Sequence, residues 1–226
     1  SGSARRARGD SAMRLTQEQL RSRLRFDWRV LTEMWGPVIA GWAYASTCHL
    51  ERGWAPIGSL AQAHRATKYR VDYHVPTLVG RGRFAPVTTI GFDLSVGDYP
   101  YQPPATWVVS EHVPYSPHFR RGAPVCIGDF WGGPEPVLLA HLVVHVGRLL
   151  NWDEVPRGGG YAGWNRDATD YWRRTYRRPL NPGLRLPSLP CHLTHGTRAV
   201  DLFEPASGAE PASVEHFMAA GGAAAT

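Results

Sequence analysis

Apolar residues recur at helical spacing between residues 15 and 35, and arginines occupy positions between them. The apolar stripe consists of Leu20, Leu24, Trp28, Leu31, Met34 and Trp35. Thr16 and Gln19 form a capping-box pattern, in which each side chain bonds the other residue's backbone N–H, and this marks a helix start. Gly36-Pro37 marks its end. We therefore predict an amphipathic helix that turns its apolar stripe to a core and its arginines outward.

Alternating apolar residues farther along the chain predict β-strands, because successive side chains of a strand point to opposite faces. Four such segments cover residues 38–45, 68–75, 88–96 and 106–110. In the third segment, one face carries Ile90, Phe92, Leu94 and Val96. A Gly-Arg-Gly-Arg turn at residues 80–83 lies between the second segment and the third. This order predicts a four-stranded antiparallel meander.

The second half of the chain predicts two more helices around an irregular, proline-rich segment. One helix begins at Pro136 and runs to about residue 151, and another begins near residue 163. Pro114, Pro117 and Pro124 precede or flank the segment that carries Cys126. Proline, glycine and alanine are frequent after residue 179. We expect a flexible basic N-terminus at residues 1–14, one folded domain at 15–178 and a Pro/Gly/Ala-rich extension at 179–226.

Composition narrows the class of protein. With 226 residues, 43% of them hydrophobic, the chain suits one sizeable globular domain. No apolar run approaches the roughly 20 residues that span a bilayer, and no apolar run follows the basic N-terminus. We therefore expect a cytoplasmic protein without a membrane segment. The net charge of +6 is spread along the chain, which favours solvated arginine faces over nucleic-acid binding.

The cysteines and histidines give little support to a metal site. Three cysteines without a Cys-x-x-Cys pair argue against a disulfide framework and against a four-thiolate zinc site. His141 and His145 stand four residues apart, but the apolar run around them favours a place in the core or along a groove. Cys191 lies close to His192 and His195, without further ligands nearby. We expect no metal and no cofactor.

One ordered set of residues points to a known family. A Tyr-Pro-Tyr-Gln-Pro-Pro motif occupies residues 99–104, Ser-Pro-His occupies 116–118, and Cys126 lies eight residues after His118. A Tyr-Pro-x-x-Pro-Pro motif, a Pro-polar pair and a cysteine in this order resemble the ubiquitin-conjugating enzyme family, over roughly residues 69–176. The resemblance implies an α+β fold with an N-terminal helix, a four-stranded antiparallel meander, a cysteine loop and C-terminal helices.

The same resemblance implies a transferase activity. Cys126 would accept the C-terminal carboxyl of a ubiquitin-like protein from an activating enzyme, as a thioester, and pass it to an amine on a target protein. A thiol suits both steps because it is a soft nucleophile and a fair leaving group. Lys68 is the only lysine, and arginine side chains stay protonated and do not attack a thioester. The divergent sequence suggests a bacterial relative, of the kind found in operons linked to antiphage defence.

Two further residues receive roles by resemblance. His118 stands where the family has an asparagine that bonds the oxyanion, and an imidazole can donate such a bond or assist deprotonation of the amine. Asp153, with Glu154 beside it, stands where the family often places an acid that orients the attacking lysine. The structural alternatives are a loop histidine bonded to backbone and a solvated helix end. In this family the activating enzyme docks on the outer face of the first helix.

The residues also leave other functions open. Cys126 could be a small buried hydrophobe between Val125 and Ile127, as most cysteines are, although the proline-rich backbone before it favours a shaped surface loop. A catalytically inactive protein that keeps the fold and binds a ubiquitin-like partner is the main alternative. A basic nucleic-acid-binding protein is a third class. A Cys–His protease is a further one, but nothing around Cys126 matches a protease's local signature.

Overall fold

A computed structural model describes residues 15–34, 66–131, 137–153 and 164–184, together with the backbone of 43–50 and 53–55. This part of the chain is an α+β structure with a small antiparallel sheet. Its helices are α1 (Gln17–Met34), α2 (Leu139–Asn151) and α3 (Arg166–Thr175). Its strands are β1 (Ala43–Leu50), β2 (Gly53–Ala55), β3 (Lys68–Tyr73), β4 (Thr77–Gly80), β5 (Arg83–Ala85), β6 (Thr88–Asp93) and β7 (Ala105–Val108).

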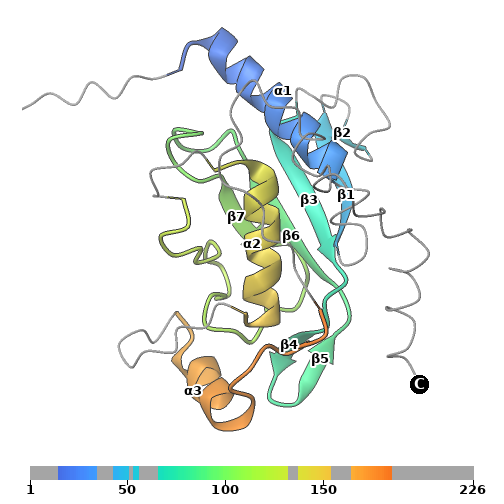
Figure 1. The fold of residues 1–226 in the computed structure, drawn as a ribbon, viewed down its shortest axis with the longest axis vertical. Helices are drawn as coiled ribbons and strands as arrows, with labels where there is room; N and C mark the ends of the chain where they lie inside the picture. The colour runs from blue at the N-terminus through green and yellow to red at the C-terminus, as the bar shows by residue number, and fades with distance from the viewer. Residues whose placement is uncertain are drawn as a thin grey trace, which may run out of the picture.

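Five of the strands form an antiparallel sheet in the order β2-β1-β3-β6-β7 (Figure 1). The remaining two strands pair as the β4–β5 hairpin, which is inserted in the chain between β3 and β6. The prediction of a four-stranded meander therefore needs correction, because it lacks β2 and the hairpin. These extra strands are only three or four residues long, too short to show the alternation by which strands are recognised in a sequence.

All four predicted strands differ from the structure at one end or both, and two of them differ by more than two residues. The segment predicted at 38–45 overlaps β1 only from Ala43, since β1 continues to residue 50 and residues 35–42 lie outside the described chain. The segment predicted at 88–96 ends at Asp93, and Val96 is exposed instead of sharing the buried face of Ile90. The Asp93 carboxylate accepts the N–H of Ser95 at 2.9 Å, which favours a turn at that point.

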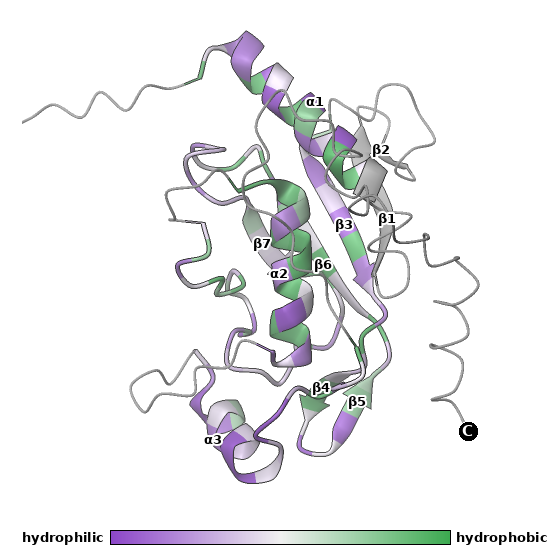
Figure 2. Cartoon of the chain, in the orientation of Figure 1, coloured by the Kyte–Doolittle hydropathy of each residue, from purple (hydrophilic) through white to green (hydrophobic). Residues whose placement is uncertain are grey.

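The main core lies between the sheet and α2. Tyr69, Val71 and Tyr73 alternate along β3 and are fully buried, which confirms the predicted pattern there. The Tyr73 hydroxyl donates to the Val143 carbonyl of α2 at 2.8 Å, so that a hydrogen bond joins sheet and helix within the packed core. Figure 2 shows mostly apolar residues along α2, nearly all of which are buried, and mostly hydrophilic residues on α3. The apolar run in the sequence therefore marks a helix buried around most of its circumference.

Gly91 allows β6 and β7 to pack closely. It pairs with Trp107 in the register of these strands. A Cβ added at Gly91 would lie 2.6 Å from Cε2 of that indole, closer than real side-chain carbons approach. The absence of a side chain is therefore what lets the indole lie over β6.

One buried carboxylate, that of Asp27, joins α1 to the rest of the domain. Asp27 accepts a hydrogen bond from Arg23 Nε at 2.7 Å and another from the Tyr99 hydroxyl. It also accepts the backbone N–H of Leu139, at 3.2 Å, where α2 begins. Burial, reinforced by the negative charge of Asp27, raises the pKa of Tyr99 well above its ordinary value. The first helix, the Tyr-Pro motif and α2 thus meet at one group.

The start of each of these two helices is set by side chains that bond backbone N–H groups. In α1, Thr16 N–H donates to the Gln19 side chain at 2.8 Å and Gln19 N–H donates to the Thr16 hydroxyl at 3.2 Å, which confirms the predicted capping box. The second predicted helix begins at Leu139 and not at residue 136. Nδ1 of His141 accepts the N–H of Leu138 at 3.0 Å, just before that start.

The chain stays packed after α3. The N–H of Leu180 donates to the Asn151 carbonyl at 2.8 Å, and the N–H of Asn181 donates to the Asn151 side chain at 2.9 Å. Leu184 packs against the main core. The folded domain therefore extends at least to residue 184, beyond the boundary predicted at 178. Residues 1–14 and 185–226 lie outside the described chain.

Candidate functional site

Cys126 lies in the irregular connection between β7 and α2, as the prolines predicted. The N–H of Val125 donates to the Thr106 carbonyl of β7 at 2.7 Å. The N–H of Cys126 donates to the His118 carbonyl at 2.9 Å. The Cys126 side chain is half-buried and carries a thiol, not a disulfide. The cysteine therefore stands on a loop whose backbone is bonded to the edge of the sheet.

The His118 side chain completes a pair of hydrogen bonds with Cys126. Its Nδ1 lies 3.0 Å from the Cys126 carbonyl oxygen. A carbonyl oxygen can only accept, so Nδ1 carries the proton. Each residue therefore donates one hydrogen bond to the carbonyl of the other, as opposed residues in an antiparallel sheet do. Here the imidazole N–H of His118 donates in place of its backbone N–H. Only 6% of His118 is exposed, which shields this bond from water. His118 is thus bonded to backbone as a loop histidine, which was the structural alternative to a catalytic role.

A second histidine holds the residue that follows the cysteine. Nε2 of His145, on α2, donates to the Ile127 carbonyl at 3.2 Å. The His145 ring also stacks on that of Phe130, with ring centroids 4.0 Å apart and planes 5° apart. The backbone of residues 125–127 is therefore bonded to β7, to His118 and to α2. Sequence reasoning placed His145 in the core or a groove and missed this bond, because its partners lie 18 residues apart.

The two histidines of α2 each serve the backbone at a different place. His141 bonds the N–H of Leu138, before the helix, whereas His145 bonds the cysteine loop. Within the described ranges, no three His, Cys, Asp or Glu side chains gather in a group that could hold a metal ion. The second set of candidate ligands, Cys191, His192 and His195, lies outside those ranges.

The Ser-Pro-His residues are anchored by the start of α3. The Pro117 carbonyl accepts the backbone N–H groups of Trp164, at 2.8 Å, and of Asn165, at 3.4 Å. The Asn165 side chain also accepts the N–H of Ala168 at 3.1 Å and so caps α3. Ser116 is fully buried. The helix predicted to begin near residue 163 thus begins at Arg166, after its Asn165 cap.

Asp153 lies just beyond the C-terminal end of α2. Its side chain accepts Nδ2 of Asn151 at 3.1 Å, and its N–H donates to the Arg148 carbonyl at 2.9 Å. At about 1.5 Å per residue, the chain from His145 to Asp153 advances roughly 12 Å along the helix axis. These hydrogen bonds tie Asp153 to the C-terminal end of α2. Glu154 lies outside the described residues.

An exposed network beside the Ser-Pro-His residues had no signal in the sequence, because its members come from three separate segments. Arg81, in the turn of the β4–β5 hairpin, lies 2.5 Å from one Asp167 oxygen, and the Tyr115 hydroxyl donates to the other. Hydrogen bonds from Tyr115 and Arg81 lower the pKa of Asp167. Bonds to Tyr115 and Asp167 raise the pKa of Arg81. The network links the hairpin, the cysteine loop and α3.

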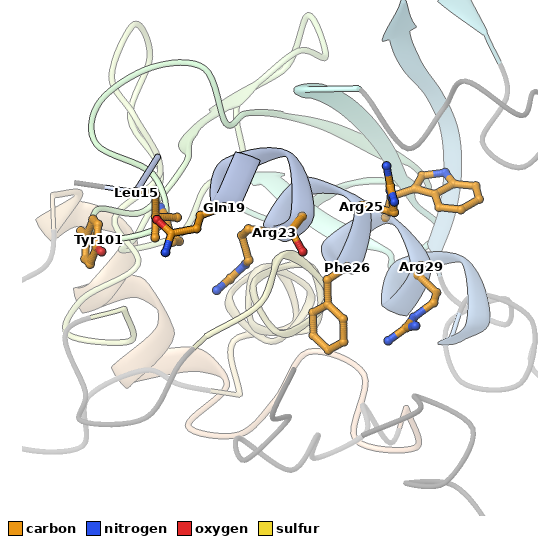
Figure 3. A pocket seen from close by; sticks show the side chains of 10 residues that line it. Leu15, Gln19, Arg23, Arg25, Phe26, Arg29 and Tyr101 are labelled. Atoms are coloured by element: carbon orange, nitrogen blue, oxygen red, sulfur yellow. The ribbon is translucent and has the colours of Figure 1, made fainter. Parts of the chain in front are cut away.

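A groove of about 710 Å³ runs along α1, and we call it the α1 groove (Figure 3). Leu15, Phe26 and Tyr101 contribute apolar surface to its lining, and Arg25 and Arg29 contribute charge. The Arg29 guanidinium lies 5.0 Å from the centre of the Phe26 ring. Figure 3 shows these two side chains on the same side of α1, with Arg25 on the other side. The groove thus combines an apolar surface with a cation.

A second groove, of about 500 Å³, lies beside the Ser-Pro-His residues, and we call it the α3 groove. Its lining includes Arg120 and Arg121 from the cysteine loop and Arg166 from α3. Trp164, at its rim, is 45% exposed. Each of the two grooves has three arginines in its lining, but the α3 groove exposes less apolar surface than the α1 groove.

Comparisons with known proteins identify no relative. No family model, curated protein or solved structure matches the chain. In the described part, no helix combines the length and the apolar composition needed to cross a bilayer. Function is therefore inferred from the residues and their geometry.

Proposed function

We propose that this chain is a conjugating enzyme for a ubiquitin-like modifier and that Cys126 carries the modifier as a thioester. The observation that supports this most is the placement of Cys126. The backbone of residues 125–127 is bonded to three other segments, while Cys126 itself is only partly buried. A nucleophile held in place loses less freedom when it reacts. In addition, the Pro100 carbonyl of the Tyr-Pro motif accepts Nε1 of Trp131, at the end of the cysteine loop. The residues that carry the resemblance thus belong to one connected region.

The proposed reaction has two acyl transfers. In the first, the Cys126 thiolate attacks the modifier's activated C-terminal carbonyl carbon. A carbon–sulfur bond to Cys126 forms, and the bond between the carbonyl carbon and the activating enzyme's group breaks. That group leaves with the electron pair of the broken bond. In the second, an amine of the target attacks the thioester carbon and loses a proton as the carbon–nitrogen bond forms. The sulfur of Cys126 leaves as thiolate and is ready for another cycle.

His118 is a positioning residue in this proposal. Its Nδ1–H is engaged by the Cys126 carbonyl, so donation to an oxyanion would have to come from Nε2. Because Nδ1 already carries a proton, Nε2 can donate only in the imidazolium form. If His118 bonded the oxyanion, the rate of transfer from the thioester to the amine would therefore fall as rising pH removes the proton from Nε2. A positioning role gives the His118 variants the same pH profile as the wild type.

Thioester formation tests the proposal directly. The chain is incubated with ATP and with an activating enzyme and a ubiquitin-like protein from the same gene neighbourhood. We expect an adduct that thiol reagents cleave and that Cys126→Ala abolishes. Cys126→Ser should give an adduct that resists thiols, because an ester replaces the thioester. Cys48→Ser and Cys191→Ser are the matched controls and should charge normally. An adduct that persists in Cys126→Ala would contradict the proposal.

The exposed arginines of α1 are the proposed docking surface for the activating enzyme. Arg21 and Arg25 are both exposed on this helix. Reversing both to Glu should slow charging, and the defect should shrink as salt is added, because surface charges act mainly on the association rate. Arg83→Glu, at an exposed site on the hairpin, is the control and should charge at the wild-type rate. Equal charging rates for all three proteins at low salt would place the docking surface elsewhere.

A further inference from the structure

The α1 groove has the chemistry of a site for an acidic, apolar peptide. Phe26, which is buried, forms part of its apolar floor, and Tyr101, which is 50% exposed, supplies an aromatic wall. Arg25 and Arg29 both line the groove, and Arg29 lies over Phe26. The exposed Arg21 adds positive charge on the same helix, outside the lining. Glu18 is an exposed acid on the first turn of the same helix, so the cations outnumber it. The groove's volume of about 710 Å³ is within the range of sites that enclose ligands.

The C-terminal part of this chain has the complementary composition. All 25 Lys and Arg residues precede residue 199, and the four acids after it are Asp201, Glu204, Glu210 and Glu215. The acids flank two apolar clusters, Val-Asp-Leu-Phe-Glu at residues 200–204 and Val-Glu-His-Phe-Met at 214–218. Opposite charges on two parts of one chain attract each other, and the apolar side chains would gain from burial.

The chain is long enough to bring this segment to the groove. The described domain ends at Leu184, which packs against the core, and Val200 lies 16 positions farther along the chain. Fully extended, such a connection spans about 55 Å. A domain of this size has a radius of gyration of roughly 16 Å, so every face is within reach. A tethered segment also has an effective concentration near the millimolar range, which allows a weak contact to be populated.

We propose that residues 200–218 dock in the α1 groove of the same chain. The α3 groove, with three arginines in its lining, attracts acids too, but it exposes less apolar surface than the α1 groove. The segment alternates acids with leucine, phenylalanine, valine and methionine, so it needs apolar surface as well as cations. The α1 groove offers both apolar surface and Arg29. If the function proposed above also holds, the docked segment lies beside the surface assigned to the activating enzyme and slows charging.

A zero-length cross-link on the full chain tests the docking without any assay of conjugation. Carbodiimide joins carboxylates to amines, and this chain has one lysine, Lys68, whose Nζ lies 3.2 Å from Asp93. Arg29→Lys keeps the charge and places an amine in the groove. Arg21→Lys is the matched control, because Arg21 is exposed on the same helix but does not line the groove. Coupled peptides are identified by proteolysis and mass spectrometry of the monomer.

We expect Arg29→Lys to couple to an acid between residues 201 and 215 with about fivefold higher yield than Arg21→Lys, since docking raises the local concentration. The yield should not depend on protein concentration and should fall in high salt. The Lys68–Asp93 link shows in each sample that the reagent worked. Equal yields from positions 29 and 21, coupling found only in dimers, or its absence at position 29 beside a strong Lys68–Asp93 link would overturn the proposal. None of these outcomes affects the thioester test.

Discussion

Replacing His118 should destabilise the cysteine loop in a way that depends on where the new side chain places its nitrogen. In the structure, Nδ1–H of His118 donates to the Cys126 carbonyl at 3.0 Å in a nearly buried position. His118→Ala removes this donor and so takes away the hydrogen bond from the imidazole to the Cys126 carbonyl. His118→Asn places an amide nitrogen where Nδ1 was, and His118→Gln places one where Nε2 was. Only the asparagine can therefore renew the bond.

The size of the effect follows from the cost of a buried polar group that loses its partner. Removing one side of a buried hydrogen bond lowers the free energy of unfolding by about 1–3 kcal/mol. With a urea dependence of about 2 kcal/mol per molar, the unfolding midpoint of His118→Ala should fall by about 0.5–1.5 M. His118→Gln should fall by a similar amount, whereas His118→Asn should lose less than half as much.

Urea titration followed by tryptophan fluorescence measures these midpoints, and the rate at which a disulfide reagent modifies the thiol gives a second readout. Loosening of the loop should raise the modification rate of Cys126 in the Ala and Gln variants and leave it near the wild-type value in Asn. Cys48→Ser and Cys191→Ser in the same background keep the readout specific to Cys126. Midpoints that rank Gln with Asn, or an Ala variant as stable as the wild type, would refute the positioning role.

Three further predictions concern the fold. Asp27→Ala should lower the free energy of unfolding by about 3–5 kcal/mol, because it leaves the buried guanidinium of Arg23 without its counter-charge. Glu18→Ala on the same helix is the control and should change it by less than about 0.5 kcal/mol, as urea unfolding midpoints of the two variants would show. Burial raises the pKa of Tyr73 well above its ordinary value, so the unfolded chain loses the Tyr73 proton at a lower pH than the folded chain. The free energy of unfolding should therefore fall as the pH rises above about 10. Tyr73→Phe should reduce this fall in urea titrations at about pH 8–11. Gly91→Ala should lower the free energy of unfolding by about 1–3 kcal/mol because its Cβ would meet Trp107, and a double-mutant cycle with Trp107→Leu should recover part of the loss.

The parts of the fold that follow local patterns could be predicted from the sequence. The capping box of Thr16 and Gln19 acts over three residues, and it is present as predicted. The alternation along β3 also matches, because one face of that strand is buried. Val96 breaks the same rule, since an Asp93–Ser95 turn ends the strand before the apolar pattern ends. The hairpin strands were missed because each is too short to show any period.

The candidate site divides in the same way. The sequence alone determined that a cysteine stands on a proline-rich loop with a histidine eight residues before it. It also determined the helices and the longer strands, because such signals act between near neighbours. Only the tertiary structure decided that Nδ1 of His118 faces the Cys126 carbonyl, that His145 bonds the next residue, and that Asp27 joins both helices. These contacts depend on how the sheet, α1 and α2 pack together. Packing is settled by the burial and hydrogen bonding of residues far apart in the chain, and no local period records it.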